Sequence, residues 1–169
     1  MKKNKVQTVA LYGLMVALAF VFSYFESMIP FNFGIPGVKL GLANLVVVVA
    51  LYIMKPSQAF SISLIRIFLT SLTFGNITVS LPYSLCGGVL SFVVMWLAKK
   101  TKLSIVGVSM LGGICHNIGQ IVVAAIIMET PNIVYYLPVL LVAGLFTGLL
   151  LGVVSKIVIN RFEKLKLNM

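Results

Sequence analysis

The stretch NFGIPGVKLGLANLVVVVAL, residues 32–51, decides how this chain is organised. Its first half holds a proline, three glycines and one lysine, and its second half is an apolar run that suits the interior of a bilayer about 30 Å thick. Pro36 fixes one φ angle, while the glycines relax the backbone enough for it to approach a ligand or another helix closely. We therefore expect an outer loop that covers a site, with Lys39 at its inner end, and a membrane helix directly behind it.

The composition excludes an ordinary soluble domain. Hydrophobic residues make up 60% of the 169 residues and charged residues only 9%, whereas about a quarter of a soluble domain is charged. One membrane span needs about 20 residues, so the chain has room for about six helices with short connections. We predict an all-α integral membrane protein, a single transmembrane domain over residues 1–169, in a bacterial cytoplasmic membrane.

Apolar runs bounded by charged or proline-containing segments predict six transmembrane helices. They cover about 6–25, 39–54, 58–72, 81–98, 104–128 and 133–159. The first is interpreted as a retained helix, because its apolar run is longer than that of a typical signal peptide and lacks a well-placed cleavage site. The third is short and carries Arg66, which leaves open whether it spans the membrane fully.

The basic residues fall into short clusters between the apolar runs, as they do where cytoplasmic loops collect Lys and Arg. With the N-terminus inside, the cytoplasmic side receives Lys2, Lys3, Lys5, Lys55, Lys99, Lys100, Lys102, Lys156, Arg161, Lys164 and Lys166. The outer side receives Lys39, Glu26 and Glu129. Both termini are therefore predicted to be cytoplasmic, and the net charge of +10 indicates topology rather than a nucleic-acid partner.

Arg66 is the ionisable side chain expected deepest in the membrane. Such a group costs several kcal/mol unless it faces protein or water, which makes it a candidate functional residue. The sequence has no aspartate, and the three glutamates are expected in loops or in the tail, away from Arg66. Either backbone carbonyls and Asn or Gln groups satisfy the guanidinium, or an anionic ligand does.

The segment His116-Asn117-Ile118-Gly119-Gln120 places three hydrogen-bonding side chains in the middle of a predicted helix. His116 and Gln120 share a face, and Asn117 lies beside Gln120. These side chains form either a polar seam to neighbouring helices or a patch that contacts substrate. One histidine without carboxylate or thiolate neighbours does not make a metal site.

Further polar residues belong to the outer half of the predicted topology. We expect a cavity that is reached from outside, floored by Arg66 and His116 and covered by the loop before Lys39. The predicted substrate-binding residues are Lys39, Asn44, Arg66, Asn76, Tyr83, Ser84, His116, Asn117 and Gln120.

Small residues recur at close helical spacing in two helices, a pattern that lets helices approach closely in lipid. They are Ala10, Gly13 and Ala17 in the first helix and Gly144, Gly148 and Gly152 in the last. In the last helix the pattern favours packing within the chain. In the first helix it is equally consistent with internal packing and with a partner subunit.

Catalytic patterns are absent from the sequence. Prenyl-transfer enzymes hold magnesium diphosphate with clustered carboxylates, because hard cations take oxygen ligands, and this chain has no such cluster. It also lacks GxxxxGK[ST], the phosphate-binding loop of many ATPases. Cys86 and Cys115 lie in apolar segments without metal-ligand spacing. We expect no catalytic residues, no metal and no cofactor.

Four segments carry a family resemblance: residues 36–52, the region around Arg66, residues 84–97 and residues 106–124. Together they resemble the Gx transporter family, whose members are often labelled heptaprenyl diphosphate synthase component I. These proteins are grouped with the substrate-binding S components of energy-coupling-factor (ECF) transporters. The resemblance covers nearly the whole chain, and KLGLAN and HNIGQ are its most specific motifs.

The resemblance implies a six-helix S-component bundle with both termini in the cytoplasm. Such proteins capture a vitamin-like molecule at the outer face, dock on a transmembrane coupling subunit with two ATPases, and topple in the membrane to release it inside. They commonly dock through an AxxxA pattern on the first helix, which here reads Gly13-xxx-Ala17 with Ala10 three residues earlier.

Two functions follow as hypotheses. The first is a substrate-binding subunit of an ECF-type importer, which takes a small vitamin-like or anionic molecule. The alternative is a non-catalytic membrane subunit linked to isoprenoid or quinone synthesis or to flavin-dependent extracellular electron transfer. In that case the polar seam serves only helix packing.

Overall fold

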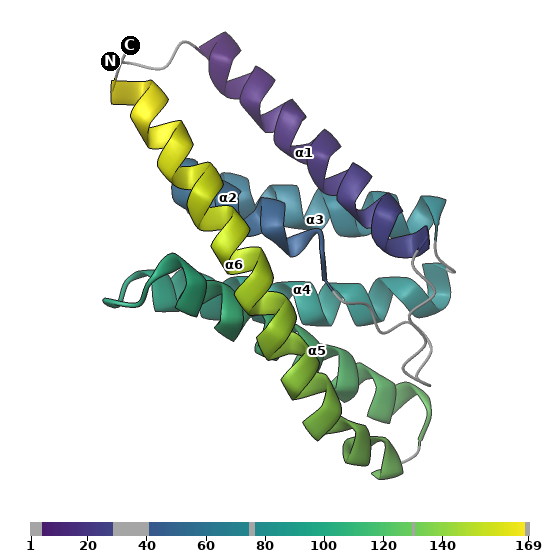
Figure 1. The fold of residues 1–169 in the computed structure, drawn as a ribbon. Coiled ribbons are helices and arrows are strands. Elements are labelled where there is room, and N and C mark those ends of the chain that lie inside the picture. The colour runs from purple at the N-terminus through teal and green to yellow at the C-terminus, as the bar shows by residue number, and fades with distance from the viewer. Residues whose placement is uncertain (1–4, 29–40, 75–76, 130, 168–169) are drawn as a thin grey trace.

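The computed structural model describes residues 5–28, 41–74, 77–129 and 131–167, and these residues are almost entirely helical (Figure 1). The elements are α1 (Lys5–Met28), α2 (Asn44–Ile53), α3 (Pro56–Thr73), α4 (Ile77–Lys99), α5 (Ile105–Ile127), the 3-10 helix η1 (Pro131–Tyr136) and α6 (Leu137–Leu167). Among them α1, α4, α5 and α6 are long and apolar enough to cross a membrane. The predicted all-α fold is confirmed.

The described start of α2 lies further along the chain than predicted. Residues 41–43 precede the helix, and Gly41 adopts a φ of +81°, a value that glycine tolerates and other residues resist. The helix has 10 residues, a rise of about 15 Å. α2 is therefore a half-length helix, shorter than the predicted span that begins at residue 39. Residues 39 and 40 of that prediction lie outside the described residues.

The other predicted bounds differ at the helix ends. α1 continues to Met28, so Glu26 belongs to the helix and the prediction that placed it in the outer loop was wrong. α3 runs without interruption through Arg66 from Pro56, whose ring suits the first turn of a helix. α4 begins at Ile77, before the predicted start at residue 81, and the last predicted helix is divided into η1 and α6.

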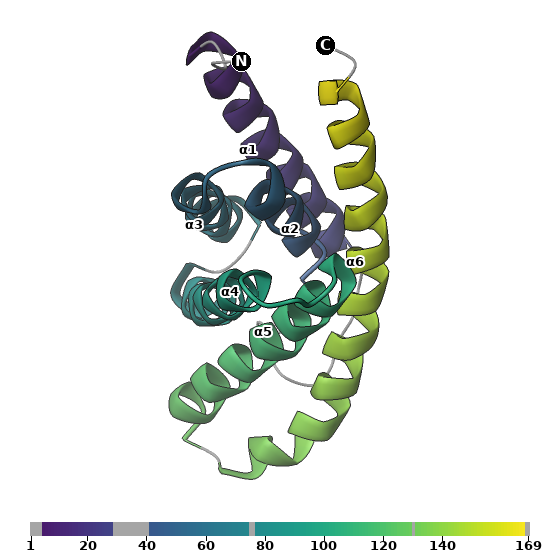
Figure 2. The same ribbon diagram turned by 90° about the vertical axis from the view of Figure 1, so that its left-hand side faces the viewer.

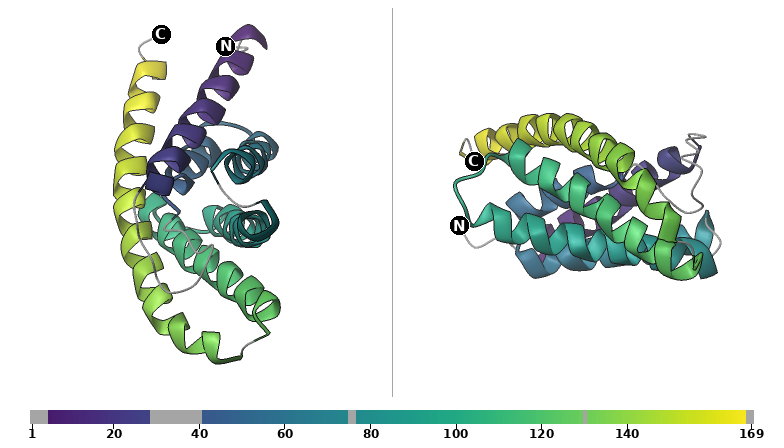
Figure 3. Two further views of the ribbon diagram at one scale, coloured as in Figure 1. Left: turned by 90° about the vertical axis from the view of Figure 1, so that its right-hand side faces the viewer. Right: turned by 90° about the horizontal axis from the view of Figure 1, so that it is seen from below.

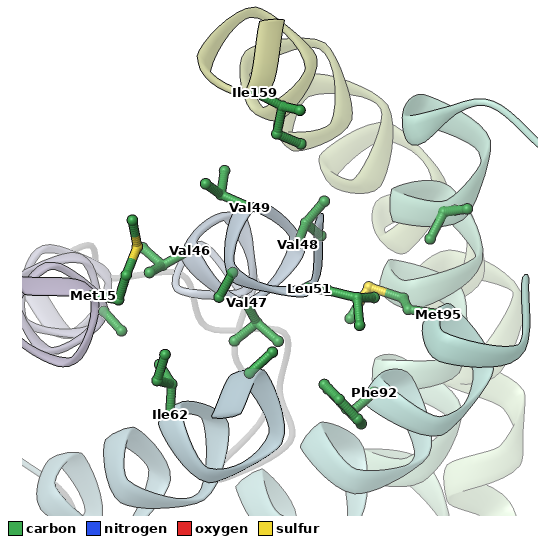
Figure 4. Packing of buried hydrophobic residues seen from close by; sticks show 14 of the residues in the cluster. Met15, Val46, Val47, Val48, Val49, Leu51, Ile62, Phe92, Met95 and Ile159 are labelled. Carbon is green, nitrogen blue, oxygen red and sulfur yellow. The ribbon is translucent and has the colours of Figure 1, made fainter. Parts of the chain in front are cut away.

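α2 forms the centre of the apolar core. Its residues 46–51 are all buried, as expected for a helix that is hydrophobic on every side. Figure 4 shows Met15 of α1, Ile62 of α3, Met95 of α4 and Ile159 of α6 around it. The shortest helix is thus enclosed by the longer ones, which fixes the position of its first turn inside the bundle.

Lys99 holds the other end of α2. Its ammonium group donates a hydrogen bond of 2.7 Å to the Leu51 carbonyl and lies 4.8 Å from the centre of the Tyr52 ring. A cation at this end stabilises a helix, because the last carbonyl groups carry partial negative charge. The C-terminal end of α4 therefore fixes the C-terminal end of α2.

α1 lies at the edge of the bundle. Among the described helices it contacts α2 and α3 only, and it diverges from α6 (Figure 2), although the start of α1 and the end of α6 lie at the same end of the molecule (Figure 1). Ala10, Gly13 and Ala17 are exposed, and a Cβ built at Gly13 would meet nothing within 4 Å. This small-residue stripe is not used for packing among the described residues.

The glycines of α6 pack against α5, with which α6 runs side by side (Figure 3). A Cβ at Gly148 would come within 2.7 Å of the Met110 Cα, and one at Gly152 within 2.8 Å of the Val106 Cα. Backbone atoms therefore meet where any side chain would collide. Packing within the chain, the interpretation favoured by the sequence for this helix, is confirmed.

Two matched substitutions test this packing. We expect Gly148→Ala to lower the Tm in detergent, because overpacking a close contact costs about 1–3 kcal/mol. Gly13→Ala should leave the Tm unchanged or raise it, since alanine favours a helix by up to about 1 kcal/mol over glycine. Thermal unfolding followed by circular dichroism measures both. Equal losses for the two variants would contradict the assigned packing.

Candidate functional site

Arg66 lies on a buried polar stripe of α3. Ser63, Arg66 and Thr70 recur at helical spacing on one face and are all buried, and Arg66 retains only 6% of its exposure. The Thr70 hydroxyl donates to the Arg66 carbonyl at 2.8 Å, so its own hydrogen-bonding demand is met within the helix. The helix thus presents one guanidinium to the interior.

Arg66 lines a small polar cavity built by several helices. Its lining residues are Ser23 and Glu26 of α1, Gly41 before α2, Arg66 and Thr70 of α3, Ser84 of α4 and His116 of α5. The cavity volume is about 10 Å³, which is room for about one water molecule. The site is polar and nearly closed in this structure.

Glu26 is a carboxylate beside Arg66 that the sequence interpretation missed. Its side chain is buried, its Oε1 accepts a hydrogen bond from the Gly41 N–H, and it lines the same cavity as Arg66. The expectation that all three glutamates lie in loops or in the tail, away from Arg66, was therefore wrong for Glu26. The signal was available, because Glu26 continues the buried helical stripe of Met15, Ala19 and Ser23.

The Arg66 guanidinium remains poorly satisfied despite this neighbour. Its Nη2 donates to the Asn44 Oδ1 at 3.4 Å, a long hydrogen bond, and its Nε has no hydrogen-bond partner among the described residues. A guanidinium carries five N–H donors in a planar fork that matches a carboxylate or phosphate. The cavity therefore presents unused donors of the kind that bind an anion.

His116 is held between two glycines of other segments. A Cβ at Gly87 of α4 would come within 3.0 Å of the His116 Nδ1, and one at Gly41 within 3.4 Å of its Cδ2. On its own helix, Gln120 Nε2 lies 3.1 Å from His116 Nε2. The imidazole thus has a fixed position at the cavity wall, with Gln120 next to it.

The structure brings together only part of the predicted substrate-binding set. Arg66, Ser84 and His116 line the cavity, with Asn44 and Gln120 in contact with two of them. Asn117 instead donates to the Leu140 carbonyl of α6 at 2.5 Å, and Tyr83 is buried in a separate apolar cluster with Ile121 and Leu140. Lys39 and Asn76 lie outside the described residues.

A second cavity of similar volume adjoins the first at Gly41. Asn44, Ser109 and Thr147 supply its polar lining, and glycines of α5 and α6 with apolar side chains of α2, α4 and α6 complete it. Gly41 is common to both linings. The turn before α2 therefore separates two small internal spaces.

Comparison with known proteins gives one match. The family model described as heptaprenyl diphosphate synthase component I matches residues 15–158, which includes every described residue of the cavity. No curated protein and no solved structure matches the chain.

A double-mutant cycle tests the pairing of Glu26 with Arg66. We expect Glu26→Gln and Arg66→Gln each to lower the Tm, because each leaves a buried charge without its counter-charge. The double variant should lose less than the sum, with a coupling energy of about 1–3 kcal/mol from chemical unfolding in detergent. Glu129→Gln, an exposed charge change, is the control. Additive losses would show that the two charges do not interact.

Proposed function

This chain belongs to the heptaprenyl diphosphate synthase component I family, and we propose that it is a substrate-binding membrane subunit, the S component of an ECF-type importer. The observation that carries the proposal is Arg66, a buried guanidinium that lines an internal cavity with unused donors. An ionisable side chain at such a position costs free energy that a purely structural role does not require. We infer that the substrate is small and anionic.

The family description names component I of a synthase, which suggests a non-catalytic subunit. Ionisation of a prenyl diphosphate uses clustered carboxylates around a divalent cation. The sequence has no aspartate, and the described residues contain no group of three His, Cys, Asp or Glu that could hold a metal ion. These residues support binding rather than prenyl transfer as the role of this chain.

The size of the cavity defines what binding requires. Sites for small molecules usually enclose about 300–1,000 Å³, whereas this cavity has room for about one water molecule. A vitamin-sized ligand therefore enters only after side chains at the cavity move.

Docking on a coupling subunit is proposed through α1. Ala10, Gly13 and Ala17 are exposed and leave the helix backbone accessible, as a close helix–helix contact in lipid requires. The start of α1 and the end of α6 lie at the same end of the molecule (Figure 1). This placement supports a topology in which both lie on the same side of the membrane. The proposed partners are a transmembrane coupling subunit and a pair of ATPases.

A second function is favoured by the contacts of the HNIGQ segment. Asn117 bonds to α6, and Gln120 lies beside His116, so these side chains already serve packing. This observation favours a non-catalytic membrane subunit linked to isoprenoid or quinone synthesis or to flavin-dependent extracellular electron transfer. The two functions differ in the proteins that accompany the chain.

Native mass spectrometry of gently solubilised protein tests the proposal. We expect the wild-type chain to retain a small anionic molecule and to carry a coupling subunit and ATPases, because capture and docking both leave stable complexes. Arg66→Gln should lose the small molecule but keep the subunits. Lys102→Gln removes an exposed charge that does not line the cavity, and this variant should keep both the small molecule and the subunits.

Two results would contradict the importer. One is a wild-type chain without any bound small molecule that also shows no Arg66-dependent affinity across a panel of vitamins. The other is recovery with prenyltransferase or electron-transfer proteins in place of ATPases, which would support the second function.

A further inference from the structure

We propose that the Glu26 carboxylate occupies the place of the substrate's own carboxylate, so that the ligand is a carboxylic acid that displaces Glu26 from the Gly41 N–H in the cavity that Arg66 also lines. The inference deepens the proposed function, on which it rests, by naming the substrate class and the group that substrate must replace. All three glutamates of the chain are described, and Glu26 alone is buried.

Charge balance is the first reason for exchange. Among the described residues that line the cavity, Arg66 is the one guanidinium and Glu26 the one carboxylate. An anionic ligand that entered beside Glu26 would add a second negative charge to a site buried away from water, which costs several kcal/mol. An anion that replaces Glu26 leaves the charge of the cavity unchanged. A single arginine can therefore serve either its own chain or a ligand, but not both fully.

The donors around Glu26 suit a carboxylate of any origin. The Gly41 N–H donates to the Glu26 Oε1, and the positive φ of Gly41 sets the direction of that N–H. Arg66 contributes an Nε without a partner among the described residues. A main-chain N–H and a guanidinium both form hydrogen bonds with carboxylates, and those from the guanidinium are charge-assisted. Both groups are donors only, so they would not bind a cationic ligand.

The small volume of the cavity also indicates that a ligand must replace Glu26. The free volume accommodates about one water molecule, so a ligand carboxylate fits only where the Glu26 side chain now lies. Glu26 stands two residues before the end of α1 at Met28, and its side chain is flexible enough to leave the cavity without breaking the helix. When the Glu26 side chain moves out, the volume that it leaves can hold the ligand carboxylate.

Exchange also alters how α1 is held. The hydrogen bond from Gly41 to Glu26 joins α1 to the turn before α2, and α1 contacts only α2 and α3 among the described helices. A ligand that takes over the Gly41 N–H removes this link. Occupancy of the cavity is thereby connected to the helix that carries the exposed small-residue stripe.

Chemical rescue with acetate tests the exchange. Glu26→Ala removes the internal carboxylate and leaves space for a small acid, so acetate should raise the Tm of this variant by about 3–6 °C at ten times its dissociation constant. Acetamide, which has the same shape but no charge, should not. The double variant Glu26→Ala/Arg66→Gln should show no rescue, and wild type should bind acetate at least about ten-fold more weakly, because its own carboxylate competes at high effective concentration.

A second variant protects the test against misfolding. If Glu26→Ala is lost in purification, line broadening of ¹³C-acetate is measured on Glu26→Gln, which keeps the side-chain volume while removing the charge. Binding by Glu26→Gln at concentrations where wild type shows none supports the exchange, and equal binding by both overturns it. Glu129→Ala is the control for loss of an exposed carboxylate.

The outcomes separate this inference from the importer itself. Acetate rescue without a retained ligand or ATPases in native mass spectrometry supports the carboxylate site and contradicts import. A ligand that depends on Arg66, together with no acetate rescue of Glu26→Ala, supports import and overturns the exchange.

Discussion

A buried positive charge must be neutralised where water is scarce, and the arrangement of this bundle depends on how that is done for Arg66. Glu26 of α1 and Arg66 of α3 line the same cavity, which Gly41 of the turn before α2 also lines. Removing either charge leaves the other buried in the low-dielectric interior without a counter-charge. The positions of α1, α2 and α3 relative to one another are therefore tied to a single electrostatic requirement.

The half-length α2 makes this meeting possible. A helix that crossed the whole membrane would bring its first turn to the surface, whereas 10 residues begin it inside the bundle. Apolar contacts on every side and the bond from Lys99 to Leu51 fix its axis and far end. The left-handed backbone at Gly41 then turns an N–H group into the cavity. Core packing thus positions a polar group that the core itself does not use.

The sequence predicted the parts of this protein that follow from periodicity and composition. The helical fold, the burial of Arg66 and the packing of Gly148 against α5 required only apolar runs and small-residue spacing. Glu26 was missed because charge suggested a loop, although its spacing continued the buried face of α1. The direction of Asn117 could not be predicted, since three polar residues on one helix face different neighbours according to the crossing of α5 with α4 and α6. Tertiary packing decides which of them reaches the cavity.

The hydrogen bonding of Arg66 distinguishes a binding site from a structural charge pair. A pair that only stabilised the fold would gain most if every donor of the guanidinium were satisfied, and replacement by apolar residues often stabilises a protein more. Among the described residues the Arg66 guanidinium makes one hydrogen bond, of 3.4 Å, and its Nε has no partner. The Glu26 carboxylate lines the same cavity and accepts a hydrogen bond from the Gly41 N–H. A guanidinium with unused hydrogen-bond donors beside a replaceable carboxylate does little to stabilise a fixed core. The same arrangement suits a site that must bind an anion and release it again.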